Sequence, residues 1–365
     1  MKIVDVRAIG VNVPLVHEFK AAYGTRKTAD FVLVEIEDDQ GRIGLGEAST
    51  IPIYDEGSQD SVLYVINKYF KPLLMGKDPT KITFLMELLN SSIKGERYAK
   101  CAIDFALHDL TGKIFKLPVY DLLGGNSRNV EVCWVISAKN PELISEEVKN
   151  KLEEGFKTFK LKVGTDKKID LKNARVVRDL IGDNINLRLD GNEAWSPKEA
   201  IQRIREFEDL YLEHVEQPVP AWNYDGLKFV REKCNTQIAA DECILNPTDV
   251  VNISKRNATD RINIKVSRSG GIIASRKMAA IAEASGQSPF AGSMLELGIG
   301  TVASAHFFVS NAGMGLATEL VGPLLLKKDI LKKPIEYKNG YLILPEGYGF
   351  GIDLDYAAVK EFSVK

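Results

Sequence analysis

Charged residues recur along the middle of the chain at a nearly constant spacing. Lys162, Asp190, Glu216, Asp241 and Lys265 are 28, 26, 25 and 24 residues apart, and each lies at the end of a short strand-like run. A strand, its returning helix and two loops take roughly 25 to 30 residues, so one such residue per unit places all of them on one rim of a parallel sheet. The spacing therefore predicts one site assembled from successive strands.

Strand-like segments recur eight times after residue 125, with helix-length stretches between them. Eight units of nearly constant length predict a closed parallel β/α barrel of the TIM type, in which catalysis takes place at the carboxyl ends of the strands. A doubly wound open sheet is the alternative, but no GxGxxG motif follows the first strand. The expected strands are residues 131–136, 158–163, 186–190, 212–216, 237–241, 261–266, 288–293 and 315–320.

The segments outside the barrel predict a second, smaller domain. The first 50 residues alternate as an antiparallel meander does, and residues 58–115 are helical in pattern. Segments 337–344 and 357–362 predict one more strand and one more helix, which we assign to the same domain. The fold class is therefore α/β, a modified TIM-type barrel with an α+β capping domain. The expected divisions are a capping domain at 1–125, a barrel at 126–325 and a C-terminal segment at 326–365 that returns to the capping domain.

Composition excludes several classes of partner. With 48 basic and 50 acidic residues the net charge is -2, which offers no bulk attraction to nucleic acid or to an anionic membrane. The N-terminus is charged at once and no uncharged run reaches the ~18 residues of a membrane span, so we expect a cytoplasmic protein. The four cysteines have no CxxC spacing, which indicates free buried thiols rather than a zinc site or disulfides.

Three carboxylates follow consecutive predicted strands, so Asp190, Glu216 and Asp241 are expected side by side. Carboxylate ligands without histidine or cysteine suit a hard divalent cation that keeps positions open for substrate, which indicates magnesium or manganese. Crowded like charges raise one another's pKa unless a cation neutralises them. Any one of these residues alone is more typical of a rim ion pair, and the joint spacing favours the metal site. His214 shares the strand face of Glu216, and we favour core packing there over metal ligation.

Three lysines complete the predicted site. Lys160 and Lys162 are one residue apart, so on a strand both point into the barrel mouth. We expect the two ammonium groups to lower each other's pKa, which lets a lysine act as a base near neutral pH. Lys265 arises four strands later, across the barrel. This arrangement suits proton transfer next to a carboxylate, with the cation stabilising the enolate. Solvated or phosphate-binding lysines and a Schiff-base lysine are the alternatives.

At these residues the chain resembles the enolase superfamily, in its muconate-lactonizing subgroup. The resemblance implies that Asp190, Glu216 and Asp241 bind magnesium, that Lys162 is the acid/base tuned by Lys160, and that Lys265 serves the opposite substrate face. It also implies a homo-oligomer. The motifs that match in order and spacing are Thr158-Phe159-Lys160-Leu161-Lys162, Asp190-Gly191-Asn192, Val215-Glu216-Gln217-Pro218, Ala240-Asp241-Glu242 and Asn263-Ile264-Lys265, with Asn192 and Glu242 expected just beyond the direct ligands.

The resemblance also bears on substrate and reaction. The segments 292–301 and 318–326 are most similar to muconate cycloisomerases, so lactonisation of a small dicarboxylic acid is preferred. Dipeptide epimerases usually carry an Asp-x-Asp pair where this chain has Glu319-Leu320-Val321. A racemase or epimerase of N-acylated amino acids or dipeptides, an o-succinylbenzoate synthase-type dehydratase and a catalytically silent scaffold stay open as alternatives. The expected substrate contacts are Phe19, Tyr23, Ile53, Arg268, Met294, Glu296 and Glu319, and a salt bridge on the rim is the alternative for Arg268.

Overall fold

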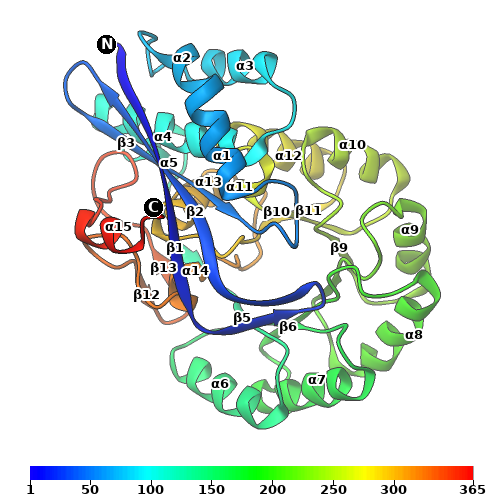
Figure 1. The fold of residues 1–365 in the computed structure, drawn as a ribbon. Coiled ribbons are helices and arrows are strands. Elements are labelled where there is room, and N and C mark those ends of the chain that lie inside the picture. Colours follow the sequence, from blue (N-terminus) through cyan, green and yellow to red (C-terminus); the bar gives the residue numbers. More distant parts are fainter. Residues whose placement is uncertain (365) are drawn as a thin grey trace.

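An antiparallel meander of three strands begins the chain: β1 (Ile3–Ala21), β2 (Gly24–Asp38) and β3 (Ile43–Thr50). The computed structural model describes residues 1–364. The register of the β1–β2 hairpin shifts between Pro14 and Phe19, and beyond this point the hairpin reaches toward the barrel (Figure 1). There the carbonyl of Lys20 accepts a hydrogen bond from the amide of Ala138, directly after the first barrel strand. The hairpin tip therefore lies on the barrel rim.

Helix α4 (Arg97–Phe115) packs across this meander at very short range. A Cβ atom at Gly46 would lie 1.9 Å from the carbonyl oxygen of Ala102, so only glycine permits the contact. The carboxylate of Asp104, also on α4, accepts a 2.6 Å hydrogen bond from the amide of Ile272 in the barrel. The helices of this region are α1 (Gln59–Val65), the π-helical η1 (Ile66–Phe70), α2 (Lys71–Leu74), α3 (Ile82–Ser92), α4 (Arg97–Phe115) and α5 (Val119–Leu122).

Seven parallel strands form the barrel sheet, in the order β11-β10-β9-β8-β7-β6-β5. Helices surround it on the outside (Figure 1). Asn140, Asp166, Ser196 and Asn246 cap the first turns of four of these helices with their side chains. The strands are β5 (Trp134–Ile136), β6 (Thr158–Lys162), β7 (Asn186–Asp190), β8 (His214–Glu216), β9 (Ile238–Ala240), β10 (Arg261–Ile264) and β11 (Ser288–Ala291).

The helices that follow these strands confirm the expected strand–helix alternation. They are α6 (Pro141–Glu153), α7 (Lys167–Ile181), α8 (Pro197–Phe207) with the 3-10 turn η2 (Glu208–Leu210), α9 (Tyr224–Lys233), α10 (Pro247–Arg256), α11 (Val266–Ser269), α12 (Ile272–Ala284), α13 (Gly298–Val309) and α14 (Gly322–Leu325).

The prediction of an eighth strand at 315–320 is wrong. Thr318 makes an isolated bridge to Val132, and Glu319 donates its amide to the carbonyl of Ala291. These few bonds close the gap between β11 and β5 without forming a continuous strand pairing. Gly315 and the Gly322-Pro323 turn lie on either side of this segment and leave only a short extended stretch between them. The first expected strand, 131–136, is also divided into two short strands.

The C-terminal segment contacts both parts of the molecule. Strands β12 (Glu336–Lys338) and β13 (Tyr341–Ile343) form an antiparallel sheet with β4 (Asn129–Glu131), which precedes the barrel. Helix α15 (Tyr356–Phe362) lies beside β1 (Figure 1), and the amide of Val364 donates to the carbonyl of Gly10. The domain divisions at 125 and 325 stay predictions.

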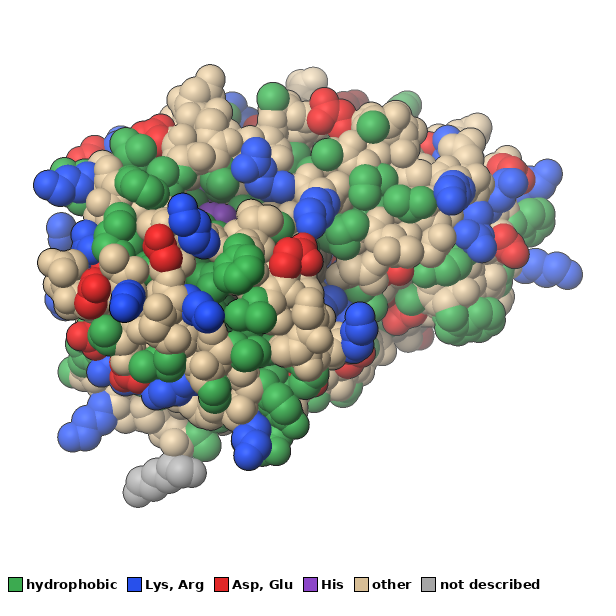
Figure 2. Space-filling view, turned by 90° about the horizontal axis from the view of Figure 1, so that it is seen from above, with side chains coloured by type: hydrophobic (Ala, Val, Ile, Leu, Met, Phe, Trp, Pro, Cys, Tyr) green, Lys and Arg blue, Asp and Glu red, His purple; other side chains and the backbone are tan. Residues whose placement is uncertain are grey.

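The surface of the described chain carries charges of both signs. Figure 2 shows Lys and Arg side chains interspersed with Asp and Glu over the face seen from above. Within residues 1–364, every helix is too short or too polar to cross a lipid bilayer. All four cysteines are free, and Cys234 alone among them is only partly buried.

Candidate active site

Three carboxylates converge at the carboxyl ends of neighbouring barrel strands. Asp190 ends β7, Glu216 ends β8 and Asp241 follows β9 directly. The parallel register pairs Asp190 with Glu216, so the spacing of about 25 residues becomes adjacency in space. Each side chain is fully buried, and one oxygen from each lies within 4.8 Å of the others. The structure therefore brings the three predicted metal ligands together.

Lys160 lies at the centre of this acidic cluster. Its Nζ is 2.9 Å from Oδ2 of Asp190, 2.8 Å from Oε1 of Glu216 and 2.8 Å from Oε1 of Glu319. The lysine is almost completely buried, so it neutralises part of the negative charge from inside the barrel.

Lys162 is two residues further along β6 and contacts the same carboxylate. Its Nζ lies 2.6 Å from Oδ2 of Asp190 and 3.0 Å from Oδ1 of Asn192. The side-chain amide nitrogen of Asn192, Nδ2, donates to Oε1 of Glu242 at 2.7 Å. Burial and the nearby charge of Asp241 raise the pKa of Glu242 to about 8. Asn192 and Glu242 thus form a link directly outside the three carboxylates, where they were expected.

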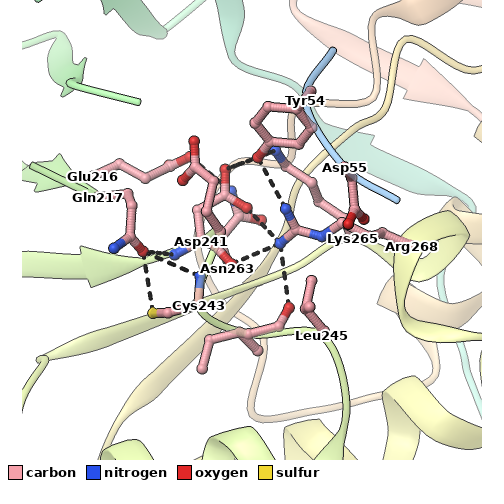
Figure 3. Close-up of polar contacts among 12 residues, drawn as sticks. Tyr54, Asp55, Glu216, Gln217, Asp241, Cys243, Leu245, Asn263, Lys265 and Arg268 are labelled. Atoms are coloured by element: carbon pink, nitrogen blue, oxygen red, sulfur yellow. Dashed lines mark hydrogen bonds and ion pairs between the residues drawn. The ribbon is translucent and has the colours of Figure 1, made fainter. Parts of the chain in front are cut away.

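Two further cationic side chains, Lys265 and Arg268, contact Asp241, the third carboxylate of the cluster (Figure 3). Nζ of Lys265 is 2.7 Å from Oδ2 of Asp241, and the guanidinium of Arg268 is 2.7 Å from Oδ1. Both cations also donate to the hydroxyl oxygen of Tyr54, which comes from the loop after β3. Gln217 accepts a 3.0 Å hydrogen bond from the amide of Asp241 and so holds its backbone in place.

Burial and charge act in opposite directions on the three carboxylates. Burial raises the pKa of Glu216 well above its usual value, and although Lys160 opposes this, the charge of Asp190 reinforces it. Burial also acts to raise the pKa of Asp190, but its two lysine partners hold it below the usual range. The pKa of Asp241 is likewise held well below its usual value, because its ammonium and guanidinium partners outweigh burial. Full ionisation of all three groups thus needs additional positive charge.

The expectation of a lowered lysine pKa is wrong. Burial, the largest single effect, and the repulsion from Lys160 act to lower the pKa of Lys162, but Asp190 together with Tyr23 and Glu216 raises it above its usual value. The pKa of Lys160 is raised as well, because four carboxylates together outweigh its burial. They are those of Asp190, Glu216, Glu319 and Asp241. In both lysines the nearby carboxylates thus favour the protonated form.

The donor set fits a divalent metal ion. The ligands are carboxylate oxygens, which hard cations prefer, and no histidine or cysteine belongs to the cluster within residues 1–364. Oε2 of Glu216 is buried and has no hydrogen-bond partner among the described residues. A cation at this position gives such an oxygen a partner and favours the charged form of Glu216.

A small cavity adjoins the carboxylates and is covered by the N-terminal domain. About 30 Å³ is open inside it, room for about two water molecules. Lys162 and Lys265 both line it. The other lining residues are Phe19, Tyr23, Ile51, Tyr54, Val135, Ser293, Met294, Leu295, Glu319, Val321 and Leu325.

Four of the seven expected substrate contacts line this cavity: Phe19, Tyr23, Met294 and Glu319. The other three do not. Ile53 is exposed and lies over Gly24 at the hairpin tip. Arg268 is buried against Asp241, and Glu296 accepts hydrogen bonds from the hydroxyls of Ser267 and Ser293. Arg268 thus forms the salt bridge that was the alternative to substrate binding, and Glu296 uses its carboxylate for hydrogen bonds within the barrel.

Sequence reasoning missed three residues that shape the site. Tyr54 lies beside the expected Ile53, but a strand period says nothing about which side chain of a loop points inward. Asn263 donates to Oε1 of Glu216 at 3.1 Å, and its strand parity with Lys265 was the available signal. Gln217, directly after Glu216, holds the Asp241 backbone.

Comparison with known proteins places this geometry in a family. The model of the enolase C-terminal domain-like family matches residues 143–359, and that of the mandelate racemase / muconate lactonizing enzyme N-terminal domain matches residues 3–124. The chain belongs to the mandelate racemase/muconate lactonizing enzyme family. This confirms the resemblance and the fold class expected from the motifs.

Members of this family similar to the chain include two kinds of isomerase. The chain is 36% identical over 357 residues to muconate cycloisomerase 1 of Acinetobacter baylyi, covering 96% of each. It is also 36% identical to the L-Ala-D/L-Glu epimerase of Clostridium acetobutylicum, covering 97% of this chain and 99% of that one. Among solved structures, the muconate lactonizing enzyme of Pseudomonas fluorescens complexed with muconolactone superimposes with a TM-score of 0.97 at 33% identity, covering 100% of this chain and 99% of that chain.

Proposed function

We propose that this chain is a magnesium-dependent isomerase that transfers a proton next to a substrate carboxylate. One observation carries the proposal. Three buried carboxylates from adjacent strands lie within 4.8 Å of one another, and the amines of Lys162 and Lys265, which pair with them, line one cavity. Asp190, Glu216 and Asp241 would hold Mg²⁺, and Mn²⁺ has the same preference for oxygen ligands. When bound, the ion supplies positive charge that stabilises an enolate.

We propose muconate-type cycloisomerisation as the reaction. One carboxylate of a dicarboxylic acid adds through oxygen to a double bond, which forms a C–O bond and moves the π electrons into an enolate. The ammonium of Lys162 then delivers its proton to the carbon next to the second carboxylate. Lys162 lines the cavity and pairs with the carboxylate of Asp190, which favours the protonated form that the group starting the step needs.

The lining of the cavity supports a substrate without an ammonium group. Glu319 is the carboxylate among the lining residues, and Lys160 already pairs with it at 2.8 Å. A substrate ammonium would therefore have to share this carboxylate with a buried lysine, and burying two cations against one carboxylate is costly. Most of the other lining residues are apolar or aromatic. The similar structure that contains muconolactone supports the same substrate class.

Racemisation or epimerisation of an N-acylated amino acid or dipeptide is the second candidate. The position of both Lys162 and Lys265 at one cavity favours it, because two-base chemistry needs an amine on each side of the substrate. An epimerase is as similar to this chain as a cycloisomerase is.

A product-resolved assay in deuterated water separates the two candidates. Purified protein with MgCl₂ is incubated with cis,cis-muconate, with N-succinyl amino acids and with dipeptides, and the products are followed by NMR. Muconate should give a lactone that carries one solvent deuterium. Solvent exchange at the α-carbon of an amino-acid substrate, with no lactone formed, would establish the second candidate instead. No magnesium-dependent reaction with any of them would contradict the proposal.

We propose in addition that the protein is a homo-oligomer located in the cytoplasm. Sedimentation velocity of the purified protein tests the assembly, and cell fractionation tests the location.

A further inference from the structure

His214 lies close to Glu216, one of the proposed metal ligands. It precedes Glu216 by two residues on β8, so both side chains point to the same face of the strand, toward the barrel interior. Nε2 of His214 is 3.8 Å from Oε2 of Glu216, and both side chains are fully buried. Neither atom has a hydrogen-bond partner among residues 1–364. A donor and an acceptor that both lack partners thus lie opposite each other.

Arg261 determines which ring nitrogen of His214 carries the proton. Nη1 of Arg261 lies 3.0 Å from Nδ1 of His214. An arginine always donates, so Nδ1 must be the acceptor and the proton of the neutral ring is on Nε2. Nε2 is 3.8 Å from Oε2 of Glu216. A metal ion cannot satisfy an N–H group, whereas a carboxylate oxygen can.

The surroundings hold the imidazole in this orientation. Arg261 is itself 3.4 Å from Oε2 of Glu213, and Glu213 also pairs with Arg188. The ring of Phe290 packs on His214 with 5.2 Å between the ring centroids. Arg261 thus contacts one edge of the ring and Phe290 packs on it. Together they fix the position of Nε2 near the carboxylate of Glu216.

We propose that His214 is a positioning residue: a shift of about 0.8 Å closes the 3.8 Å separation to hydrogen-bond length, so that Nε2–H donates to Oε2 of Glu216 and sets the orientation of this carboxylate in the metal site. The inference rests on the proposed metal site. Oε1 of Glu216 already has Lys160 at 2.8 Å and Asn263 at 3.1 Å as donors, whereas Oε2 has none. A carboxylate oxygen has two lone pairs, so it accepts from the imidazole and still serves a cation. Hydrogen bonds of this kind to metal ligands strengthen metal binding.

Calorimetric titration with MgCl₂ of the whole protein tests the proposal without an activity readout. His214→Leu should weaken the affinity for Mg²⁺ about 10- to 100-fold. His214→Gln keeps an N–H donor near the position of Nε2 and should stay within about threefold of the wild type. His306→Asn is the matched control, because His306 is equally buried but contacts Tyr120 and Phe350 instead. It should leave the affinity unchanged.

The outcomes separate this inference from the proposed function. Wild-type protein that takes up no Mg²⁺ would remove the metal site and this role together. Uptake by the wild type with equal affinity in His214→Leu would overturn the role of His214 alone.

A spectroscopic measurement on the wild type remains decisive if His214→Leu does not fold. The ¹⁵N shifts of the His214 ring, assigned through loss of its signals in His214→Gln, should show a neutral ring protonated at Nε2. A ring protonated at Nδ1 would contradict the proposal.

Discussion

The hydroxyl oxygen of Tyr54 lies 2.8 Å from Nζ of Lys265, so a loop of the N-terminal domain contacts an amine of the barrel. The phenol also donates to Oδ2 of Asp241 at 2.9 Å and accepts from Arg268. A single hydroxyl thus connects the loop that covers the cavity with the charges inside it. Displacing this loop therefore breaks hydrogen bonds to Lys265, Asp241 and Arg268.

Removal of this hydroxyl should impair turnover without unfolding the protein. In Tyr54→Phe the ammonium of Lys265 loses one hydrogen bond, and a hydrogen bond to a charged group contributes about 1.5 to 3 kcal/mol. We expect kcat/KM for the preferred substrate to fall about 10- to 100-fold. Steady-state kinetics measure this. Tyr64→Phe is the control, because Tyr64 is exposed on α1. Equal kinetics in both variants would show that the contact has no role in turnover.

The two amines should differ in their importance for lactonisation. Lys162→Met should lower kcat about 10²- to 10⁴-fold, because the proton donor is lost. Lys265→Met should retain measurable lactonisation, because a one-base reaction needs Lys265 only for its charge. Both variants should abolish any racemisation of N-succinyl amino acids, since this reaction alternates between the two amines. The exposed Lys157→Met serves as the control. Complete loss of lactonisation in Lys265→Met would argue against one-base chemistry.

Magnesium should stabilise the folded protein through the three carboxylates. At a concentration 100-fold above the dissociation constant, a ligand that binds only the folded state adds about 2.7 kcal/mol to the free energy of unfolding. Asp241→Asn should lose this increment, whereas the exposed Asp183→Asn should keep it. Urea unfolding with and without MgCl₂, at matched ionic strength, measures the difference. A magnesium effect that persists in Asp241→Asn would place the ion elsewhere.

Buried His306 should make the protein sensitive to mild acid. Burial lowers its pKa to about 3, whereas in the unfolded chain the value is about 6.5. Between these two values the unfolded chain binds more protons, so the free energy of unfolding decreases as pH falls below about 6.5. The slope from this group is about 1.4 kcal/mol per pH unit.

His306→Asn should remove that contribution and still offer an acceptor to the amide of Tyr120. Urea midpoints at several pH values between 5 and 7.5 measure the difference between variant and wild type. Carboxylates elsewhere titrate in both proteins and cancel in this difference. Parallel pH profiles would show that His306 does not contribute.

The contact between helix α4 and the meander should tolerate no side chain at Gly46. A Cβ there would lie 1.9 Å from the carbonyl oxygen of Ala102, so Gly46→Ala must displace backbone. We expect a loss of about 1 to 3 kcal/mol in the free energy of unfolding, or more. Gly315→Ala is the matched control, because nothing lies within 4 Å of a Cβ at that position. Comparable unfolding midpoints of the two variants would contradict the packing argument.

Much of the site could be predicted because it depends on a local rule repeated along the chain. A residue that ends a strand in a parallel barrel lies next to its counterpart on the following strand, so Asp190, Glu216 and Asp241 could be placed together from spacing alone. Strand parity placed Lys160 and Lys162 on one face in the same way. The same rule failed at Thr318, where flanking glycines and a proline leave too few residues for a ladder.

By itself, the sequence determined the family, the barrel and the five charged groups at its rim, because these follow from period, parity and motif. Only the tertiary structure decided which partners those charges have. Tyr54 and Lys265 are 211 residues apart, and no local pattern relates them. The direction of the Lys162 pKa was mispredicted for the same reason, since electrostatic energy depends on distance in space. The carboxylate at 2.6 Å and the other acidic groups nearby together outweigh burial and the second ammonium.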